Sequence, residues 1–231
     1  MSSNKTSRKE SIALGIALLF HTCGLAGMLF TAHKEWFIKS TPVTLVLMFL
    51  LVLWVQEKKS LFFWIYLLIA FSIGLFAEMA GVHTGVLFGD YSYGTVLGPG
   101  FAGVPLLIGI NWFLVTYGAA SIMQRADAWT KRKYEEAGIK ISTRLSYFSY
   151  IADAALLATF FDWLMEPVAA KLGFWQWKDD VVPPYNYLCW YLLSFLLMII
   201  LKALKPFAPN LFALHLFIIQ ALFFLALRTF L

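Results

Sequence analysis

Apolar runs of 16 to 25 residues recur along nearly the whole chain, and this pattern constrains the fold more than any other feature. Such runs suit membrane helices, because about 20 apolar residues cross the hydrocarbon core of a bilayer. The chain is 61% hydrophobic and only 13% charged, unlike a soluble domain. We therefore predict an all-α fold, a polytopic membrane bundle forming a single domain over residues 1–231. Its seven transmembrane helices are expected at residues 11–32, 41–56, 61–80, 100–123, 145–169, 185–204 and 209–230.

Basic residues divide unevenly between the two ends of these predicted helices. Thirteen of the 18 Lys and Arg residues fall on the side of the N-terminus, and five fall on the other side. The positive-inside rule therefore predicts a cytoplasmic N-terminus, an outer C-terminus and a location in the cytoplasmic (inner) membrane. The first run follows Lys5, Arg8 and Lys9, but it is too long for a signal peptide, so we expect a retained helix.

The sequence carries no signature of a nucleic-acid, metal or redox site. The net charge of +5 follows from the topology, so nucleic acid is not an expected partner. Cys23 and Cys189 fall in or beside predicted helices and give neither a metal-ligand pattern nor a disulfide framework. The four His residues show no HxxxH or HxH spacing. We expect no metal and no cofactor.

Three carboxyl groups lie inside or at the end of predicted membrane helices. Asp162 and Glu166 are four residues apart and share a helix face, and Glu78 closes another helix. Ionisable groups in hydrocarbon are rare and usually functional, and burial disfavours their charged form. Pro167 has no N–H and therefore frees the carbonyl of Trp163. We expect these acids to be catalytic, while the plainer interpretation is polar contact between helices.

Two predicted outer loops, rich in Gly and aromatic residues, follow the acid-bearing helices. Beside the acids, these aromatic side chains favour a lipophile pocket, whereas aromatic residues at a membrane interface often only anchor the protein. Deeper Trp rings would suit a carbocation, because Trp faces attract cations. Polar groups nearby favour a wet pocket. The candidate substrate and water-binding residues are Thr84, Tyr91, Tyr93, Asn111, Trp112, Trp163, Trp175, Trp177, Asn186 and Trp190.

Two blocks of residues within about 74–193 resemble carotenoid biosynthesis membrane proteins of the carotenoid 1,2-hydratase and bisanhydrobacterioruberin hydratase type. The first block is an acid followed by Gly-x-x-Thr-Gly-x-x-Phe-Gly-x-Tyr-x-Tyr, here Glu78 and then residues 81–93. The second is Asp, an acid-Pro pair, Gly-x-Trp-x-Trp and Asn-x-x-x-Trp. Here it comprises Asp162, Glu166, Pro167, Gly173, Trp175, Trp177, Asn186 and Trp190.

The resemblance implies that water adds to a terminal double bond of an acyclic carotenoid end group, such as that of lycopene or γ-carotene. Asp162 is the expected proton donor, and Glu78 and Glu166 would position the water or return the proton. One alternative is a lycopene cyclase-type membrane enzyme, in which the same protonation leads to ring closure. Another is a seven-helix transporter or carotenoid-binding protein without enzymatic activity. Membrane lipid is an expected partner in every case.

The topology predicts which loops a membrane-impermeant thiol reagent reaches in intact cells. We expect the reagent to label Asp179→Cys in the loop after residues 145–169, and not Lys133→Cys in the basic loop. The reverse labelling pattern would overturn the predicted orientation and move the acids to the inner side of the membrane.

Overall fold

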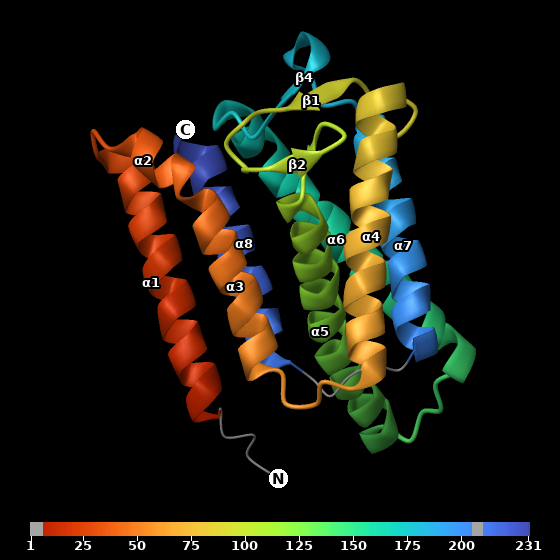
Figure 1. Ribbon diagram of the computed structural model, residues 1–231. Coiled ribbons are helices and arrows are strands. Elements are labelled where there is room, and N and C mark those ends of the chain that lie inside the picture. The colour runs from red at the N-terminus through yellow and green to blue at the C-terminus, as the bar shows by residue number, and fades with distance from the viewer. Residues whose placement is uncertain (1–6, 205–209) are drawn as a thin grey trace.

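The chain forms a bundle of α-helices that carries two small β-ribbons at one end (Figure 1). The computed structural model describes residues 7–204 and 210–231. Its helices are α1 (Arg8–Phe30), α2 (Lys34–Lys39), α3 (Thr41–Val55), α4 (Leu61–Thr84), α5 (Leu107–Glu136), α6 (Thr143–Lys171), α7 (Pro184–Leu204) and α8 (Leu211–Phe230). Its strands are β1 (Tyr91–Tyr93), β2 (Gly100–Phe101), β3 (Val104–Pro105) and β4 (Trp175–Trp177).

Each of the seven predicted apolar runs contains a helix of at least 15 residues. Six of the described helices are long and apolar enough to cross a membrane, so this is an integral membrane protein. The other long helix, α3, is apolar but has only 15 residues. The seven-span count and the orientation of the termini stay predictions. Lys5, Lys205 and the predicted first residue of the last helix, residue 209, lie outside the described residues.

The structure corrects the prediction of a helix from residue 100. Residues 100–105 form an antiparallel ribbon, in which β2 pairs with β3, and α5 begins only at Leu107. Ala102 and Gly103 both have positive φ angles, 49° and 77°, as a tight two-residue turn requires. The helix then continues to Glu136, through part of the polar segment after its apolar run. An all-α description is therefore incomplete at the end of the bundle that carries the strands.

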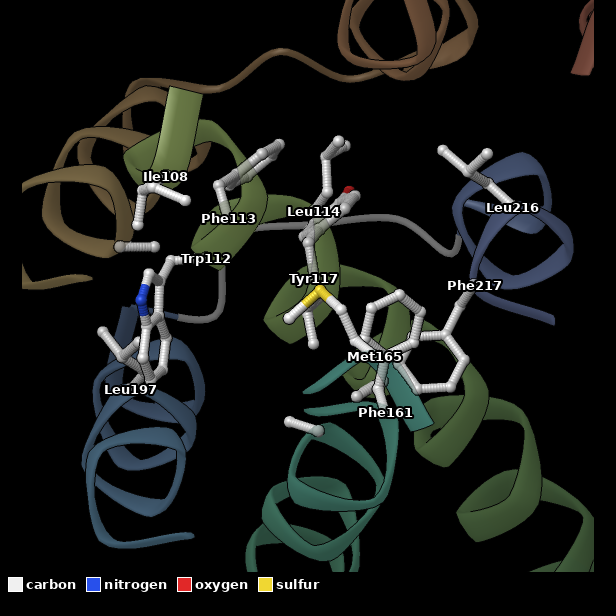
Figure 2. Close-up of a cluster of buried hydrophobic side chains, with 14 of the residues drawn as sticks. Ile108, Trp112, Phe113, Leu114, Tyr117, Phe161, Met165, Leu197, Leu216 and Phe217 are labelled. Atoms are coloured by element: carbon white, nitrogen blue, oxygen red, sulfur yellow. The ribbon is translucent and has the colours of Figure 1, made fainter. Parts of the chain in front are cut away.

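Helix α5 is the centre of the bundle and packs against α3, α4, α6, α7 and α8. Figure 2 shows Trp112, Phe113 and Tyr117 of α5 among side chains of the neighbouring helices, including Phe161 and Met165 of α6. Helix α1 lies at the edge of the bundle and packs mainly against α8 (Figure 1). The core thus fixes α4, α5, α6 and α7 around one interior.

The loops after α4 and α6 meet in the ribbon formed by β1 and β4. Helix α4 ends at Gly85, whose φ of 65° is the left-handed cap conformation that glycine adopts without strain. β1 then pairs antiparallel with β4, with Tyr91 opposite Trp177 and Tyr93 opposite Trp175. Side chains at alternate positions of a strand share a face, so both Tyr and both Trp side chains lie on the same side of the ribbon.

Arg228 donates a hydrogen bond to the Trp163 carbonyl, which Pro167 leaves without its helical donor in α6. The Trp163 carbonyl has no N–H donor four residues ahead, as the sequence predicts, because that residue is Pro167. Arg228 Nη1 donates to this oxygen at 2.6 Å, and its guanidinium lies 3.8 Å from the centre of the Trp163 ring. The end of α8 is thereby tied to the break in α6.

This tie predicts a coupling between Arg228 and Pro167. We expect Arg228→Met to lower the free energy of unfolding by about 1 kcal/mol, because the Trp163 carbonyl loses its donor. In a Pro167→Ala background the helix regains its own N–H, so the same substitution should cost less. Thermal melting of the purified single and double variants measures the coupling, and an equal cost in both backgrounds would contradict it.

Candidate active site

Glu78, Asp162 and Glu166 line one small cavity at the end of the bundle beneath β1 and β4, which we call the acid cavity. All three carboxyl groups are buried, with Asp162 fully inaccessible. The volume is about 20 Å³, which is room for one water molecule by the measure that assigns about 10–15 Å³ to each. The lining is aromatic and polar, and comprises Glu78, Phe88, Tyr91, Tyr93, Ile108, Asn111, Trp112, Asp162, Met165, Glu166, Trp175, Trp177, Asn186 and Trp190.

Glu78 accepts three hydrogen bonds from aromatic side chains. Its Oε2 accepts from the hydroxyl groups of Tyr91 at 2.5 Å and Tyr93 at 2.8 Å. Its Oε1 accepts from Trp112 Nε1 at 2.9 Å. Hydrogen bonds to the charged form favour it, and three donors in a buried site replace the water that a carboxylate would otherwise bind. Of the three acids, Glu78 is best equipped to hold a negative charge.

The tyrosines of β1 are fixed as hydrogen-bond donors. Burial raises the pKa of the Tyr91 and Tyr93 phenols, and the nearby Glu78 carboxyl raises it further. Both side chains are therefore protonated at neutral pH. They contribute O–H dipoles to the cavity rather than a base.

Glu166 is held by the two tryptophans of β4. Its Oε2 accepts from Trp175 Nε1 at 2.8 Å and from Trp177 Nε1 at 2.7 Å. The intervening Gln176 is exposed, as the alternation of the strand requires. The ribbon thus delivers phenol donors from β1 to the acid of α4, and indole donors from β4 to the acid of α6.

Asp162 has a different environment, because only one of its oxygens is satisfied. Asn186 of α7 donates its Nδ2 to Asp162 Oδ2 at 2.8 Å. Oδ1 is buried and has no hydrogen-bond donor among the described residues. Glu166, one helical turn further along α6, and Glu78 line the same cavity as Asp162. A buried oxygen without a donor is costly as part of a carboxylate, and is readily explained as the oxygen that carries a proton.

Aromatic rings form the wall opposite α6. Trp112 stacks on Trp190 with ring centres 3.9 Å apart and planes 11° apart. This close approach depends on Gly74, because a Cβ there would overlap the Trp112 ring. Phe88 is buried beside them, and its backbone N–H lies 3.5 Å from Cys189 Sγ. Helices α4, α5 and α7 together position an electron-rich surface over the acids.

Two predicted site residues lie outside the acid cavity. Thr84 is exposed, and its hydroxyl donates to the Ala80 carbonyl at 2.6 Å near the end of α4. Trp163 is 42% exposed and packs against Phe160 and Arg228 on the outer surface of α6. Every other predicted residue lines the cavity, including Asn111, whose Nδ2 lies 4.0 Å from Met165 Sδ.

Three lining residues were not predicted from the sequence: Phe88, Ile108 and Met165. Met165 is three residues after Asp162 and one before Glu166, so helical periodicity would have put it on the face of the acids. Ile108 likewise lies one turn before Asn111 and Trp112 on α5. Within residues 7–204 and 210–231, no group of three or more His, Cys, Asp or Glu side chains is arranged to hold a metal ion.

The geometry combines a proton donor, a proton acceptor and space for water. Asp162 has an oxygen without a donor among the described residues, Glu78 accepts from three donors, and Glu166 lines the same cavity. Such a set can protonate an uncharged group and deprotonate a bound water within one small space. The aromatic side chains that line the cavity lie near any positive charge that forms between these steps.

Comparison with known proteins assigns the chain to a family. The profile of the family described as carotenoid biosynthesis protein matches residues 36–230. The matched region includes all three acids and both strands of the ribbon, and α1 precedes it. No curated protein and no solved structure gives a significant match.

The dependence of Trp112 on Gly74 yields a stability prediction. We expect Gly74→Ala to destabilise the protein by about 1–3 kcal/mol, because the added methyl group displaces the Trp112 ring from Glu78. Gly15→Ala in α1 is the matched control, since its Cβ meets nothing within 4 Å and Ala is favoured over Gly in helices by about 1 kcal/mol. Thermal melting and tryptophan fluorescence compare the two variants. A Gly74→Ala protein as stable as the control would show that Trp112 is not tightly held.

Proposed function

The chain belongs to the carotenoid biosynthesis protein family, and on this basis we propose that it is a cofactor-independent carotenoid 1,2-hydratase. Its substrate is an acyclic carotenoid end group, such as that of lycopene or γ-carotene. The reaction adds water across the terminal isoprenoid double bond and gives a tertiary alcohol. The observation that carries the proposal is the unpartnered Oδ1 of Asp162, buried beside two further carboxyl groups.

Protonation of the alkene is the demanding step, and Asp162 is the proposed acid. An unactivated double bond is a weak base, so its proton must come from a carboxylic acid that stays neutral until the substrate arrives. Asn186 donates to Oδ2 at 2.8 Å, which leaves the proton for Oδ1. Transfer of this proton to the less substituted carbon breaks the π bond and leaves a tertiary cation. Asp162 then carries the negative charge.

Water capture and proton return involve the other two acids. A water molecule bonds to the tertiary carbon through its oxygen and loses a proton to a carboxylate, for which Glu78 has the best environment. Glu166 lies one helical turn from Asp162 in the same cavity, and its proposed role is to return the proton to that acid. The net reaction converts an alkene and water into an alcohol, and it needs no oxidant or reductant. Because interacting carboxyls share protons, the three titrate as a group.

The surroundings of the acids suit a cation that forms and is then quenched by water. Trp112 and Trp190 present π-electrons, and the ordered indole and phenol dipoles need no rearrangement during the reaction. A cavity with room for about one water favours capture by water over capture by a second double bond. This favours a hydratase over the lycopene cyclase-type reaction, which begins with the same protonation.

The reaction takes place inside the membrane in this proposal. The acids lie at the end of the bundle that the basic residues predict to be the outer end, in the inner membrane. Water reaches them from that side, and the lipophilic substrate reaches them from the lipid. A carotenoid therefore need not leave the bilayer to react.

Co-expression with the enzymes that make lycopene or γ-carotene tests the function. We expect products heavier by one water per reacted acyclic end, formed equally well under anaerobic conditions. Asp162→Asn keeps an acceptor for Asn186 but has no acidic proton, so it should lower the rate by about 100-fold or more. Mass spectrometry of extracted carotenoids measures both outcomes.

The control is Asp153→Asn, because this exposed residue of α6 lies outside the acid cavity. It should retain nearly full activity. Products with unchanged mass but a new ring would favour the cyclase alternative, and a gain of one oxygen atom would mean a hydroxylase. An unaltered carotenoid bound to the protein would favour a transporter or carotenoid-binding protein.

A further inference from the structure

A second and much larger cavity lies beside the acid cavity, and we call it the side chamber. Its lining residues come from α1, α2, α3, α5, α6 and α8, and from the segment that leads into β4. Its volume is about 360 Å³, within the range of about 300–1,000 Å³ that small-molecule sites occupy. Many of its walls are aromatic, including Phe20, Trp36, Phe37, Phe174, Phe223 and Phe224.

Some polar groups of the side chamber are satisfied by their own helices, whereas the buried Thr41 hydroxyl has no hydrogen-bond partner among the described residues. His21 Nδ1 donates to the Ala17 carbonyl at 2.8 Å, and the Thr44 hydroxyl donates to the Ser40 carbonyl at 3.3 Å. Among the described residues that line the chamber, His21 and Cys23 have titratable side chains, and none is Asp, Glu, Lys or Arg. An apolar, flat-walled space of this kind suits a rigid hydrocarbon rather than a polar metabolite.

The side chamber and the acid cavity share one wall. Ile108 and Asn111 of α5, Met165 of α6 and Trp175 of β4 line both spaces. At this shared wall, Asn111 Nδ2 of α5 lies 4.0 Å from Met165 Sδ of α6, a long and weak polar contact. A Met side chain changes its rotamer readily, so this wall can open without any movement of the helices.

We propose that the side chamber holds the acyclic isoprenoid chain of the substrate while the terminal double bond passes the Asn111–Met165 contact to reach Asp162. Naming the occupant as the substrate rests on the proposed function. The acid cavity is too small for an isoprenoid end group, so the substrate needs a neighbouring space that opens into it. The side chamber meets this need, and its aromatic walls match a conjugated chain.

The mouth of the side chamber faces the outside of the bundle. Leu19 and Phe20 of α1 and Trp36 of α2 line it and are exposed, with Trp36 at 65%. In a membrane protein such apolar surface lies against lipid, so the substrate enters sideways from the bilayer. One wall is α1, which precedes the family match at residue 36.

Binding of lycopene to the purified protein in detergent tests the side chamber. The probe is quenching of tryptophan fluorescence by the polyene, measured in an Asp162→Asn background so that no turnover occurs. Gly24→Leu fills the chamber, because a Cβ at Gly24 already lies 3.6 Å from the Phe223 ring. We expect the lycopene concentration for half-maximal quenching to rise about tenfold or more. Gly15→Leu on the same helix has open space around it and should leave binding unchanged.

A labelling experiment on the folded protein separates blocked binding from misfolding. Cys23 is exposed and lines the side chamber, whereas Cys189 is buried. A bulky aromatic maleimide added to the purified protein should therefore attach to Cys23 and reduce quenching by lycopene. The Cys23→Ala variant should bind lycopene normally and be unaffected by the reagent.

The outcomes distinguish the two proposals. If Gly24→Leu and labelled Cys23 bind lycopene as well as the unmodified protein, the side chamber is not the site, whatever the reaction. Equal displacement of lycopene by a phospholipid at the same mole fraction would also overturn it, because the chamber would then hold any acyl chain. If Gly24→Leu and labelled Cys23 lose lycopene binding but the unmodified protein forms no hydrated product in cells, the side chamber is the binding site and the hydratase proposal is wrong.

Discussion

The cost of burying three carboxyl groups in a membrane bundle determines how this end of the protein is built. A buried polar group without partners is costly, and hydrocarbon supplies none. Here the partners come from the ribbon and from α5 and α7, which provide phenol, indole and amide donors to Glu78, Glu166 and Asp162. The short β1–β4 pairing is therefore part of the site, because its alternation directs all four aromatic donors to one side.

An uneven supply of donors gives chemically similar acids different properties. Glu78 has three donors on two oxygens, Glu166 has two on one oxygen, and Asp162 has one. Glu78, with the most hydrogen-bond donors, is suited to carry a negative charge, and Asp162, with the fewest, is suited to carry a proton. The proposed roles of Asp162 as acid, Glu78 as base and Glu166 as proton relay follow from this difference in donors. The side chamber would bring an apolar substrate to Asp162.

Much of the site was predictable because its residue types are unusual where they occur. Acids in apolar helices and paired aromatic residues after them stand out in any membrane sequence, and all but Thr84 and Trp163 of the predicted residues line the acid cavity. The sequence indicated Thr84 as a polar group of a wet pocket and Trp163 as one of the deeper Trp rings. Helical rotation directs Trp163 away from Asp162, its neighbour in sequence, while Asn186 reaches that acid from another helix.

The sequence by itself determined the apolar helices, the acids and the donor residues, because hydropathy and helical spacing are local properties of the chain. It did not determine that residues 100–105 form a ribbon. Their turn depends on positive φ angles at Ala102 and Gly103, which the hydropathy of the run does not indicate. Only the tertiary structure decided which donor serves which acid and where Arg228 binds. It also decided that a side chamber lies beside the acids. Such contacts join residues far apart in the chain, and they depend on how helices pack, which no local pattern records.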